Sequence, residues 1–206
     1  MEEKAGLIIL AGGRSRRMGR DKALLTVAGE TMIRRLLKQF GDREAWTPLI
    51  SSNRPALHGE AGVPVVTDRY WRRGPLAGIH AGLLRSPHAL NLVIACDLPY
   101  ACPEVGGRLL KLAAEGGSGA VVPVVHGRMQ PLFAVYHRQL AGPMGAFLES
   151  EDGQVQSFLK TVPTRYVKEP FPENVFFNMN RPEDHHRVEE WERATDGDPG
   201  EGFTKS

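Results

Sequence analysis

Short runs of apolar residues recur along the chain, and the segments between them carry apolar positions at intervals of three or four residues. The runs lie at 7–11, 63–66, 91–96, 120–125, 131–136 and 175–177. Unbroken apolar runs of this kind are typical of strands buried on both faces, as in a parallel sheet. A weaker strand candidate, less apolar than a central strand should be, precedes Asn53.

The periodic segments predict amphipathic helices. Their apolar positions are Ile33, Leu36, Leu37 and Phe40; Leu76, Ile79 and Leu83; and Val105, Leu109, Leu112 and Ala113. In the second helix, Gly78 and Gly82 permit a close approach to the sheet. Strands that alternate with helices predict an α/β fold, in which a three-layer, mostly parallel sheet is flanked by helices. We expect one domain over 1–194 and a disordered tail over 195–206, where the periodicity ends.

Composition narrows the class of protein. The 206 residues carry a formal net charge of +2, so the charge balance does not indicate a nucleic-acid-binding protein. No stretch approaches the ~20 apolar residues of a membrane-spanning helix, and the first residues are acidic, so we expect a cytoplasmic protein with no membrane contact. Cys96 and Cys102 are too few for a disulfide framework, and Cys96, at the end of an apolar run, is expected to be a buried thiol.

The turn after the first strand combines a glycine pair with a concentration of positive charge. Gly12 and Gly13 let backbone N–H groups approach a ligand closely. Five cations follow within nine positions, at Arg14, Arg16, Arg17, Arg20 and Lys22. The P-loop pattern and the dinucleotide fingerprint are both absent. The alternative is a surface loop with solvated arginines, but the pattern favours a cradle for a triphosphate.

Two carboxylates come directly after predicted strands. Asp97 follows the run 91–96, where a carboxylate at the end of a strand is a suitable ligand for Mg²⁺; a helix cap or a buried ion pair is the alternative. Asp68 follows the run 63–66 and precedes a Gly-Pro turn, which leaves open a purely turn-forming role. In open α/β sheets, ligands bind at the carboxyl ends of the strands, where both residues are predicted to lie.

Asparagines supply further candidates. Asn178 and Asn180 lie between a short apolar run and a helix that begins with proline. Asn178 is a candidate metal ligand through its amide oxygen, whereas Asn180 has the alternative of capping the helix. Asn53 is a candidate for a hydrogen bond to a base or ribose. The adjacent His185 and His186 point about 100° apart on a helix, so we expect them to face solvent.

These motifs, taken together and in order, resemble the molybdenum cofactor guanylyltransferases of the MobA type. The stretches that carry the resemblance are LAGGRSRRMGRDKALL, VVTD followed by GPLAG, CDLPY, QPLFAVY and FNMNRPED. They extend from about residue 6 to 192, nearly the whole chain. The pair Asp21-Lys22 after Arg-Met-Gly favours the guanylyl enzymes over the related cytidylyl enzymes. The resemblance implies a dinucleotide-binding-like nucleotidyltransferase fold.

The resemblance also implies roles for individual residues. Those implied to bind GTP are Leu10, Ala11, Gly12, Gly13, Lys22, Asn53, Asp68 and Asp97. In the implied reaction the catalytic residues are Lys22, Arg17 and Asp97, the Mg²⁺ ligands are Asp97 and Asn178, and the pterin side holds Asn180 and Gln130. The expected partners are GTP, molybdopterin and, transiently, other proteins that make or accept the molybdenum cofactor.

The reaction implied by this resemblance is nucleotidyl transfer. GMP passes from GTP to the terminal phosphate of molybdopterin, and pyrophosphate leaves. Three alternatives stay open from the sequence. One is a related transferase that uses CTP or a sugar phosphate. The second is a carrier that binds nucleotide or cofactor without catalysis, and the third is an NAD-dependent oxidoreductase, which the missing glycine fingerprint disfavours.

Overall fold

The computed structural model describes residues 4–12, 26–27, 29–42, 44–70, 72–150, 153–179 and 182–196. The strands are β1 (Ala5–Leu10), β2 (Thr26–Val27), β3 (Glu30–Thr31), β4 (Trp46–Ser51), β5 (Val65–Val66), β6 (Leu90–Ala95), β7 (Ala120–Val125), β8 (Arg128–Met129), β9 (Phe133–His137) and β10 (Thr164–Val167). The α-helices are α1 (Met32–Gln39), α2 (Gly74–Arg85), α3 (Pro103–Ala114), α4 (Ala141–Ser150), α5 (Val155–Leu159) and α6 (Pro182–Asp196). Short 3₁₀ helices are η2 (Pro55–Ala61), η3 (Arg138–Leu140) and η4 (Glu173–Phe176).

Within the described part of the chain, one sheet has the strand order β10-β7-β9-β6-β1-β4-β5, with β8 paired to β7. Strands β6, β1, β4 and β5 run parallel to one another, and β7 is parallel to β10. Strand β9 runs antiparallel to both β6 and β7. A mostly parallel sheet with helices on both faces confirms the predicted α/β class.

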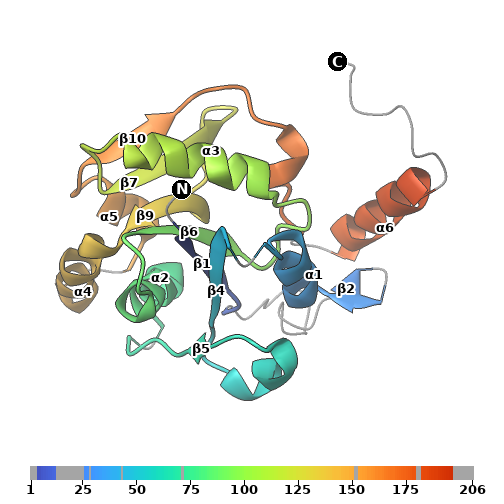
Figure 1. Cartoon of the computed structure of the whole chain (residues 1–206), viewed down its shortest axis with the longest axis horizontal. Coiled ribbons are helices and arrows are strands. Elements are labelled where there is room, and N and C mark those ends of the chain that lie inside the picture. The colour runs from blue at the N-terminus through green and yellow to red at the C-terminus, as the bar shows by residue number, and fades with distance from the viewer. Residues whose placement is uncertain are drawn as a thin grey trace.

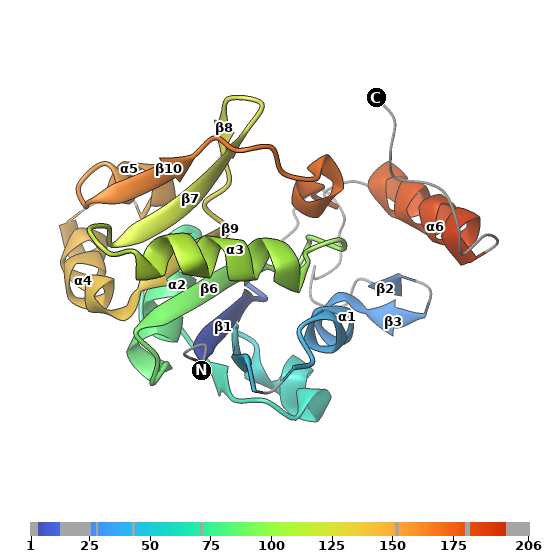
Figure 2. The same ribbon diagram turned by 45° about the horizontal axis from the view of Figure 1, so that its top comes forward.

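Each face of the sheet has its own hydrophobic core. One core contains apolar side chains of α1 and α3, and the other contains those of α2, α4 and α5. Figures 1 and 2 show α3 and α2 on opposite sides of the sheet. All three predicted amphipathic helices are therefore confirmed as α1, α2 and α3, and Cys96 is buried as expected.

The glycines of α2 explain how closely this helix approaches the sheet. A Cβ on Gly82 would lie 2.6 Å from Cγ2 of Ile8, and one on Gly78 would lie 3.1 Å from Oγ of Ser51. Real Cβ atoms do not approach another heavy atom as closely as 2.6 Å, so an alanine at position 82 would displace the helix or strand β1. The close approach predicted from Gly78 and Gly82 is confirmed.

Two predicted parallel strands differ from the structure. The run 131–136 contributes to β9, which is antiparallel because the chain reverses in the tight β7–β8 hairpin, with positive φ at His126 (49°) and Gly127 (73°). So short a connection cannot return the chain for a parallel pairing. The run 175–177 is not a strand: it begins within η4, after Pro172, and Val175 and Phe176 are nevertheless buried.

The weaker strand candidate is a central strand. Strand β4 pairs with β1 on one side and β5 on the other, and Trp46, Leu49 and Ile50 are buried. Threonine, proline and serine interrupt its apolar pattern, which is why the sequence understates it. The run 63–66 is extended only at Val65–Val66. Helices α4 and α5 and strand β10 were not predicted.

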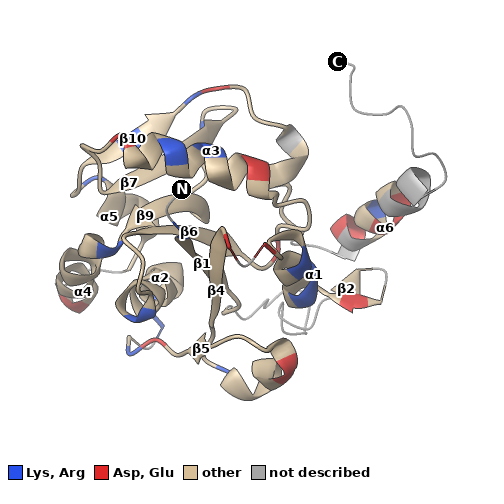
Figure 3. Cartoon of the chain, in the orientation of Figure 1, with Lys and Arg blue, Asp and Glu red and all other residues tan. Residues whose placement is uncertain are grey.

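The C-terminal segment begins as predicted, with a helix that starts at Pro182 and carries Glu183 and Asp184 in its first turn. Helix α6 continues through Asp196, and the remainder of the expected tail lies outside the described residues. In Figures 1 and 2, α6 lies beside β2. A search of the described residues finds no helix long and apolar enough to cross a membrane. Figure 3 shows acidic and basic residues distributed over both helical layers.

Candidate functional site

The carboxyl ends of four parallel strands meet at one edge of the sheet. Leu10, the last residue of β1, is in register with Ser51 on β4 and Ala95 on β6, and Ser51 is in register with Val66 on β5. Backbone hydrogen bonds continue past the strand ends, from Ala11 N to Ser51 O at 2.9 Å. Among the described residues, the predicted site residues Gly12, Asn53, Asp68 and Asp97 each follow one of these strands and therefore lie on this edge.

The turn after β1 is described only in its first residues. Leu10 and Ala11 are buried, whereas Gly12 is exposed, and no heavy atom of the described residues lies within 4 Å of where its Cβ would be. The role of Gly12 in binding GTP stays a prediction. Predicted residues Gly13, Arg17 and Lys22 lie outside the described residues.

Asn53 and Asp68 form a reciprocal pair at the ends of β4 and β5. The Asn53 amide nitrogen donates to Oδ2 of Asp68 at 2.6 Å, and the Asp68 backbone nitrogen donates to the Asn53 amide oxygen at 3.2 Å. The second bond fixes the amide orientation, because a rotated amide would present N–H to N–H. Asn53 is exposed and Asp68 half-buried, so the pair presents its outer atoms to solvent.

Asp97 and Asn178 form a second amide–carboxylate pair beyond the end of β6. Asp97 is 7% exposed, and Asn178 is exposed. The amide atom that faces Asp97 lies 2.7 and 2.8 Å from the two carboxylate oxygens. With nitrogen at that position, the amide donates two hydrogen bonds to the carboxylate. The structure thus brings together the two residues predicted to bind a metal.

The same pair suits a hard cation when the amide is rotated. A half-turn of the amide would bring the Asn178 oxygen toward the carboxylate, and carboxylate and amide oxygens are the donors that Mg²⁺ takes. The described residues contain no group of three or more His, Cys, Asp or Glu side chains that could hold a metal. The donor set of Asp97 and Asn178 therefore fits Mg²⁺, a cation that keeps several of its waters or takes ligand phosphates as additional donors.

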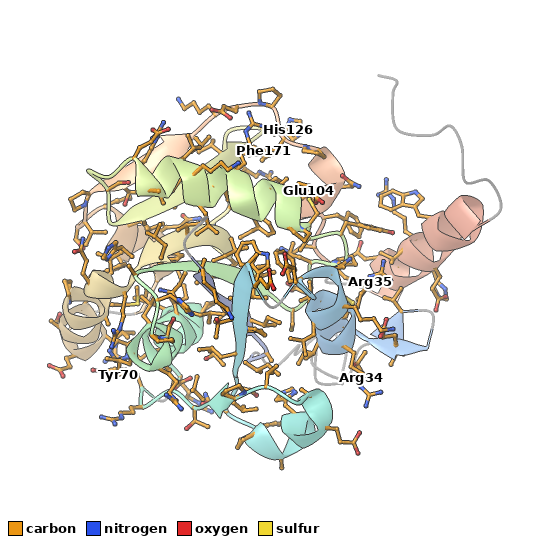
Figure 4. All side chains as sticks on the ribbon, in the orientation of Figure 1. Arg34, Arg35, Tyr70, Glu104, His126 and Phe171 are labelled. Carbon is orange, nitrogen blue, oxygen red and sulfur yellow. The ribbon has the colours of Figure 1, made fainter. Side chains whose placement is uncertain are left out.

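Hydrogen bonds to backbone carbonyls hold the two segments that carry this pair, the turn after β6 with Asp97 and the segment around Asn178. The Met179 nitrogen donates to the Asp97 carbonyl at 2.9 Å, which joins the Asn178 segment directly to the end of β6. On the other side, Arg35 Nε and Gln39 Nε2 donate to the Pro99 carbonyl at 3.1 and 3.0 Å. Arg35 is a residue of α1 and is labelled in Figure 4. Helix α1 thereby fixes the turn that follows Asp97.

Aromatic side chains pack helix α6 against both the segment that carries Asp97 and the segment that carries Asn178. The Trp191 ring lies 5.6 Å from that of Tyr100, which follows Asp97, and 5.4 Å from that of Phe177, which precedes Asn178. The Arg187 guanidinium lies 4.8 Å from the centre of the Trp191 ring. Such ring and cation–π contacts each stabilise by about 0.5–1.5 kcal/mol, so α6 supports the geometry of the pair.

A small separate core lies beneath these rings. It consists of Val27, Met32, Met179 and Val188, all fully buried. Val27 lies on β2, Met32 begins α1, and Val188 lies on α6. Met179, the residue after Asn178, therefore packs in one cluster with residues of β2, α1 and α6.

The remaining predicted residues are placed as follows. Gln130 is half-buried at the end of β8, on the same edge, close to where the Ala95 nitrogen donates to the Leu132 carbonyl at 2.8 Å. Asn180 lies outside the described residues. His186 is exposed as expected, and the side chain of His185 is outside the described set.

Burial shifts the pKa of two side chains outside the two pairs, His80 and Cys102. Burial, assisted by the charge of Arg69, lowers the pKa of His80, whose ring packs edge-on against Tyr70 at 5.4 Å. Figure 4 labels Tyr70, which precedes α2. Burial raises the pKa of the Cys102 thiol, which lies just before α3, and therefore favours the protonated thiol.

Sequence reasoning missed two buried polar residues at this edge. Ser52 and His58 are buried and hydrogen-bonded to each other beneath Asn53. The one signal in the sequence was the histidine in the segment PALHGEA, which connects two strands. The segment was too short to separate from an ordinary loop.

Comparison with known proteins identifies the family of this chain. Residues 7–168 match the family model described as a MobA-like NTP transferase domain. A relative from Pelotomaculum thermopropionicum, named a probable molybdenum cofactor guanylyltransferase, is 40% identical over 188 residues, which cover 86% of this chain and 88% of the relative.

Solved structures show the same architecture. The molybdopterin-guanine dinucleotide biosynthesis protein A of Archaeoglobus fulgidus superposes with a TM-score of 0.81 at 25% identity, covering 92% of this chain and 99% of that one. A 2-C-methyl-D-erythritol 4-phosphate cytidylyltransferase from Thermus thermophilus, at 20% identity and a TM-score of 0.67, covers 93% of this chain and 100% of its own, and shares the fold. The chain belongs to the family of MobA-like NTP transferase domains.

Proposed function

We propose that this protein transfers GMP from GTP to the terminal phosphate of molybdopterin, with release of pyrophosphate. The observation that carries the proposal is the placement of two amide–carboxylate pairs, Asn53–Asp68 and Asp97–Asn178, on the edge where β1 ends in its glycine turn. One pair suits a nucleoside and the other suits the cation that accompanies a triphosphate. The relatives named as guanylyltransferases support the same activity.

Each pair has a defined task in this proposal. Asp68 and Asn53 accept and donate hydrogen bonds to the ribose or base, in positions fixed by their mutual bonds. Asp97 and Asn178 hold Mg²⁺, which when bound neutralises charge on the nucleotide phosphates. Because Asp97 is buried at the end of β6, its carboxylate has a fixed position. The phosphates would thus be aligned relative to the nucleoside before the reaction begins.

The reaction requires no covalent intermediate on the protein. An oxygen of the acceptor's terminal phosphate attacks the α-phosphorus of GTP, and a new P–O bond forms. The bond from the α-phosphorus to the oxygen that bridges to the β-phosphate breaks, and pyrophosphate departs with that oxygen. The protein contributes alignment and charge stabilisation, which together account for large rate accelerations in reactions of this kind.

Several roles in this scheme rest on sequence alone. We assign Gly13, Lys22 and Arg17 to the triphosphate and the departing pyrophosphate, and Asn180 to the pterin side. Gln130, on the far side of β6 from Asn53, is assigned to the acceptor as well. The cytoplasmic location and transient contacts with other proteins of the cofactor pathway remain predictions.

A substrate comparison tests the proposal. Purified protein is supplied with Mg²⁺, molybdopterin and one of GTP, CTP, ATP or UTP, and pyrophosphate release and the dinucleotide product are measured. We expect turnover with GTP that depends on the pterin acceptor. Preference for CTP would instead indicate a sister transferase. Tight binding of GTP without turnover would indicate a carrier.

A further inference from the structure

The Asn53–Asp68 pair rests on a buried polar layer formed by Ser52 and His58. Both side chains are nearly inaccessible, at 4% and 5% exposure. His58 Nε2 lies 3.0 Å from Ser52 Oγ, and the two share a hydrogen bond. The same hydroxyl accepts a bond from the Arg54 backbone nitrogen at 3.1 Å.

These bonds enclose Asn53. Because Ser52 Oγ accepts from the nitrogen of Arg54, the hydroxyl bridges across Asn53 and holds its backbone as the apex of a tight turn. Ser52 is itself anchored, since its backbone nitrogen donates to the Val66 carbonyl at 2.9 Å. The turn that presents Asn53 is therefore tied to β5, the strand that leads to Asp68.

His58 is an unusual choice of buried residue for η2. It is the buried residue of that 3₁₀ helix, whereas its neighbour Leu57 is 41% exposed. If η2 needed only an apolar anchor, leucine would face inward and histidine outward, because burying an imidazole costs free energy unless it is hydrogen-bonded. Because histidine is buried and leucine exposed, we infer that residue 58 faces inward to make the hydrogen bond to Ser52.

We propose that His58 and Ser52 are positioning residues that set the Asn53–Asp68 pair for the nucleoside half of the substrate. The inference rests on the proposed function, in which this pair contacts the ribose or base of a nucleoside triphosphate. Without the Ser52–His58 bond, the hydroxyl is free to rotate away from Arg54, and the Asn53 turn loses its fixed conformation. Binding of the nucleoside then weakens, while binding of the triphosphate at the far end of the site does not change.

The test separates the two halves of the nucleotide. Affinities of His58→Ala and Ser52→Ala for GTP are measured by calorimetry, and affinities for inorganic tripolyphosphate by competition. We expect about a tenfold loss of GTP affinity, a matching rise in KM with kcat nearly unchanged, and tripolyphosphate binding equal to that of the wild type. Discrimination between GTP and the other nucleoside triphosphates should fall as well.

Two further variants serve as controls. His58→Gln places an amide near the position of Nε2 and should recover most of the lost affinity. His88→Ala removes a comparable bond, from His88 Nε2 to Thr47 Oγ1 at 2.8 Å, at the opposite end of β4. It should reduce thermal stability without changing nucleoside affinity. Circular dichroism melts establish that each variant is folded.

The outcomes are distinct. Wild-type GTP affinity in folded His58→Ala, or an equal loss for GTP and tripolyphosphate, would overturn the positioning role. If the wild type turns over another nucleoside triphosphate instead of GTP, the proposed function fails. The positioning role is then tested in the same way with that nucleotide.

Discussion

The two pairs at this edge each consist of an asparagine and an aspartate, but they differ in how firmly the asparagine amide is held in one orientation. In Asn53–Asp68, the amide oxygen is occupied by the Asp68 backbone, so the amide has one orientation. In Asp97–Asn178, the amide nitrogen donates to the carboxylate, and a half-turn of the amide would present its oxygen there instead. A fixed pair suits a ligand recognised by donor and acceptor pattern. The second pair would suit a cation, which Asp97 and the oxygen of a rotated Asn178 amide would hold.

The pairs also differ in how the chain builds them. Asn53 and Asp68 are 15 residues apart and follow neighbouring parallel strands. Asn178 comes from a distant segment and is held against Asp97 by Met179 and by the rings that attach α6. The first pair is thus a product of the sheet, and the second depends on a peripheral helix. Damage to α6 should therefore affect one pair and spare the other.

The largest expected effect comes from Asp97→Asn. Removing the buried anion leaves the cation with neutral ligands only, so turnover should fall by ~10²-fold or more. Pyrophosphate release measures it, with Asp42→Asn as the control, since Asp42 caps a turn at the opposite edge. Sequence reasoning predicts a loss of similar size for Lys22→Ala. Near-normal turnover in both Asp97→Asn and Lys22→Ala would contradict the assignment of the phosphate half.

Asn53→Ala should affect binding more than chemistry. The substitution removes the partner of Asp68, so GTP affinity should fall about tenfold with kcat nearly unchanged. Steady-state kinetics separates the two constants. A large fall in kcat with an unchanged KM would show that the pair acts on the reacting phosphates and would erase the contrast between the two pairs.

Asn178→Asp sharpens the contrast through stability. A second carboxylate close to Asp97 repels it when no cation is present, which should cost ~1 kcal/mol and lower Tm by roughly 2–4 °C. Added Mg²⁺ should raise Tm more in this variant than in the wild type. Thermal melts with a chelator and with Mg²⁺ provide the measurement. Equal Mg²⁺ effects in both proteins would mean that position 178 does not face the ion.

Trp191→Ala tests the dependence on α6 and has the smallest expected effect. Trp191 is 36% exposed, so its loss should leave the protein folded and raise the Mg²⁺ concentration needed for half-maximal activity by about two- to threefold. The affinity for GTP without Mg²⁺ should not change. Tyr166→Ala, an aromatic side chain of 40% exposure on β10, is the matched control. Identical behaviour of the two variants would show that α6 does not support the Asp97 pair.

Much of this arrangement could be predicted from the sequence, for a physical reason. Apolar runs locate the buried strands, and polar residues such as Asp97 and Asp68 that follow them must lie at the shared edge of a parallel sheet. The prediction required no knowledge of distances. The strands were located best at β1 and β6, whose residues are all buried except Leu90.

The parts that sequence could not provide depend on contacts between distant segments. The direction of β9 is set by the β7–β8 turn, and the run 175–177 is apolar because it is buried, not because it is extended. Nothing in the order of residues shows that Asn178 reaches Asp97 or that His58 lies beneath Ser52. Those contacts exist only once the sheet and its peripheral helices are assembled.

The most direct test of the central claim is a crystal structure of the protein soaked with GTP and Mn²⁺, with anomalous scattering used to locate the ion. The account predicts an anomalous peak within coordination distance of the Asp97 carboxylate and the Asn178 amide oxygen. It also predicts the nucleoside within hydrogen-bond distance of Asn53 and Asp68. A nucleotide bound elsewhere, or a manganese peak away from Asp97, would contradict it.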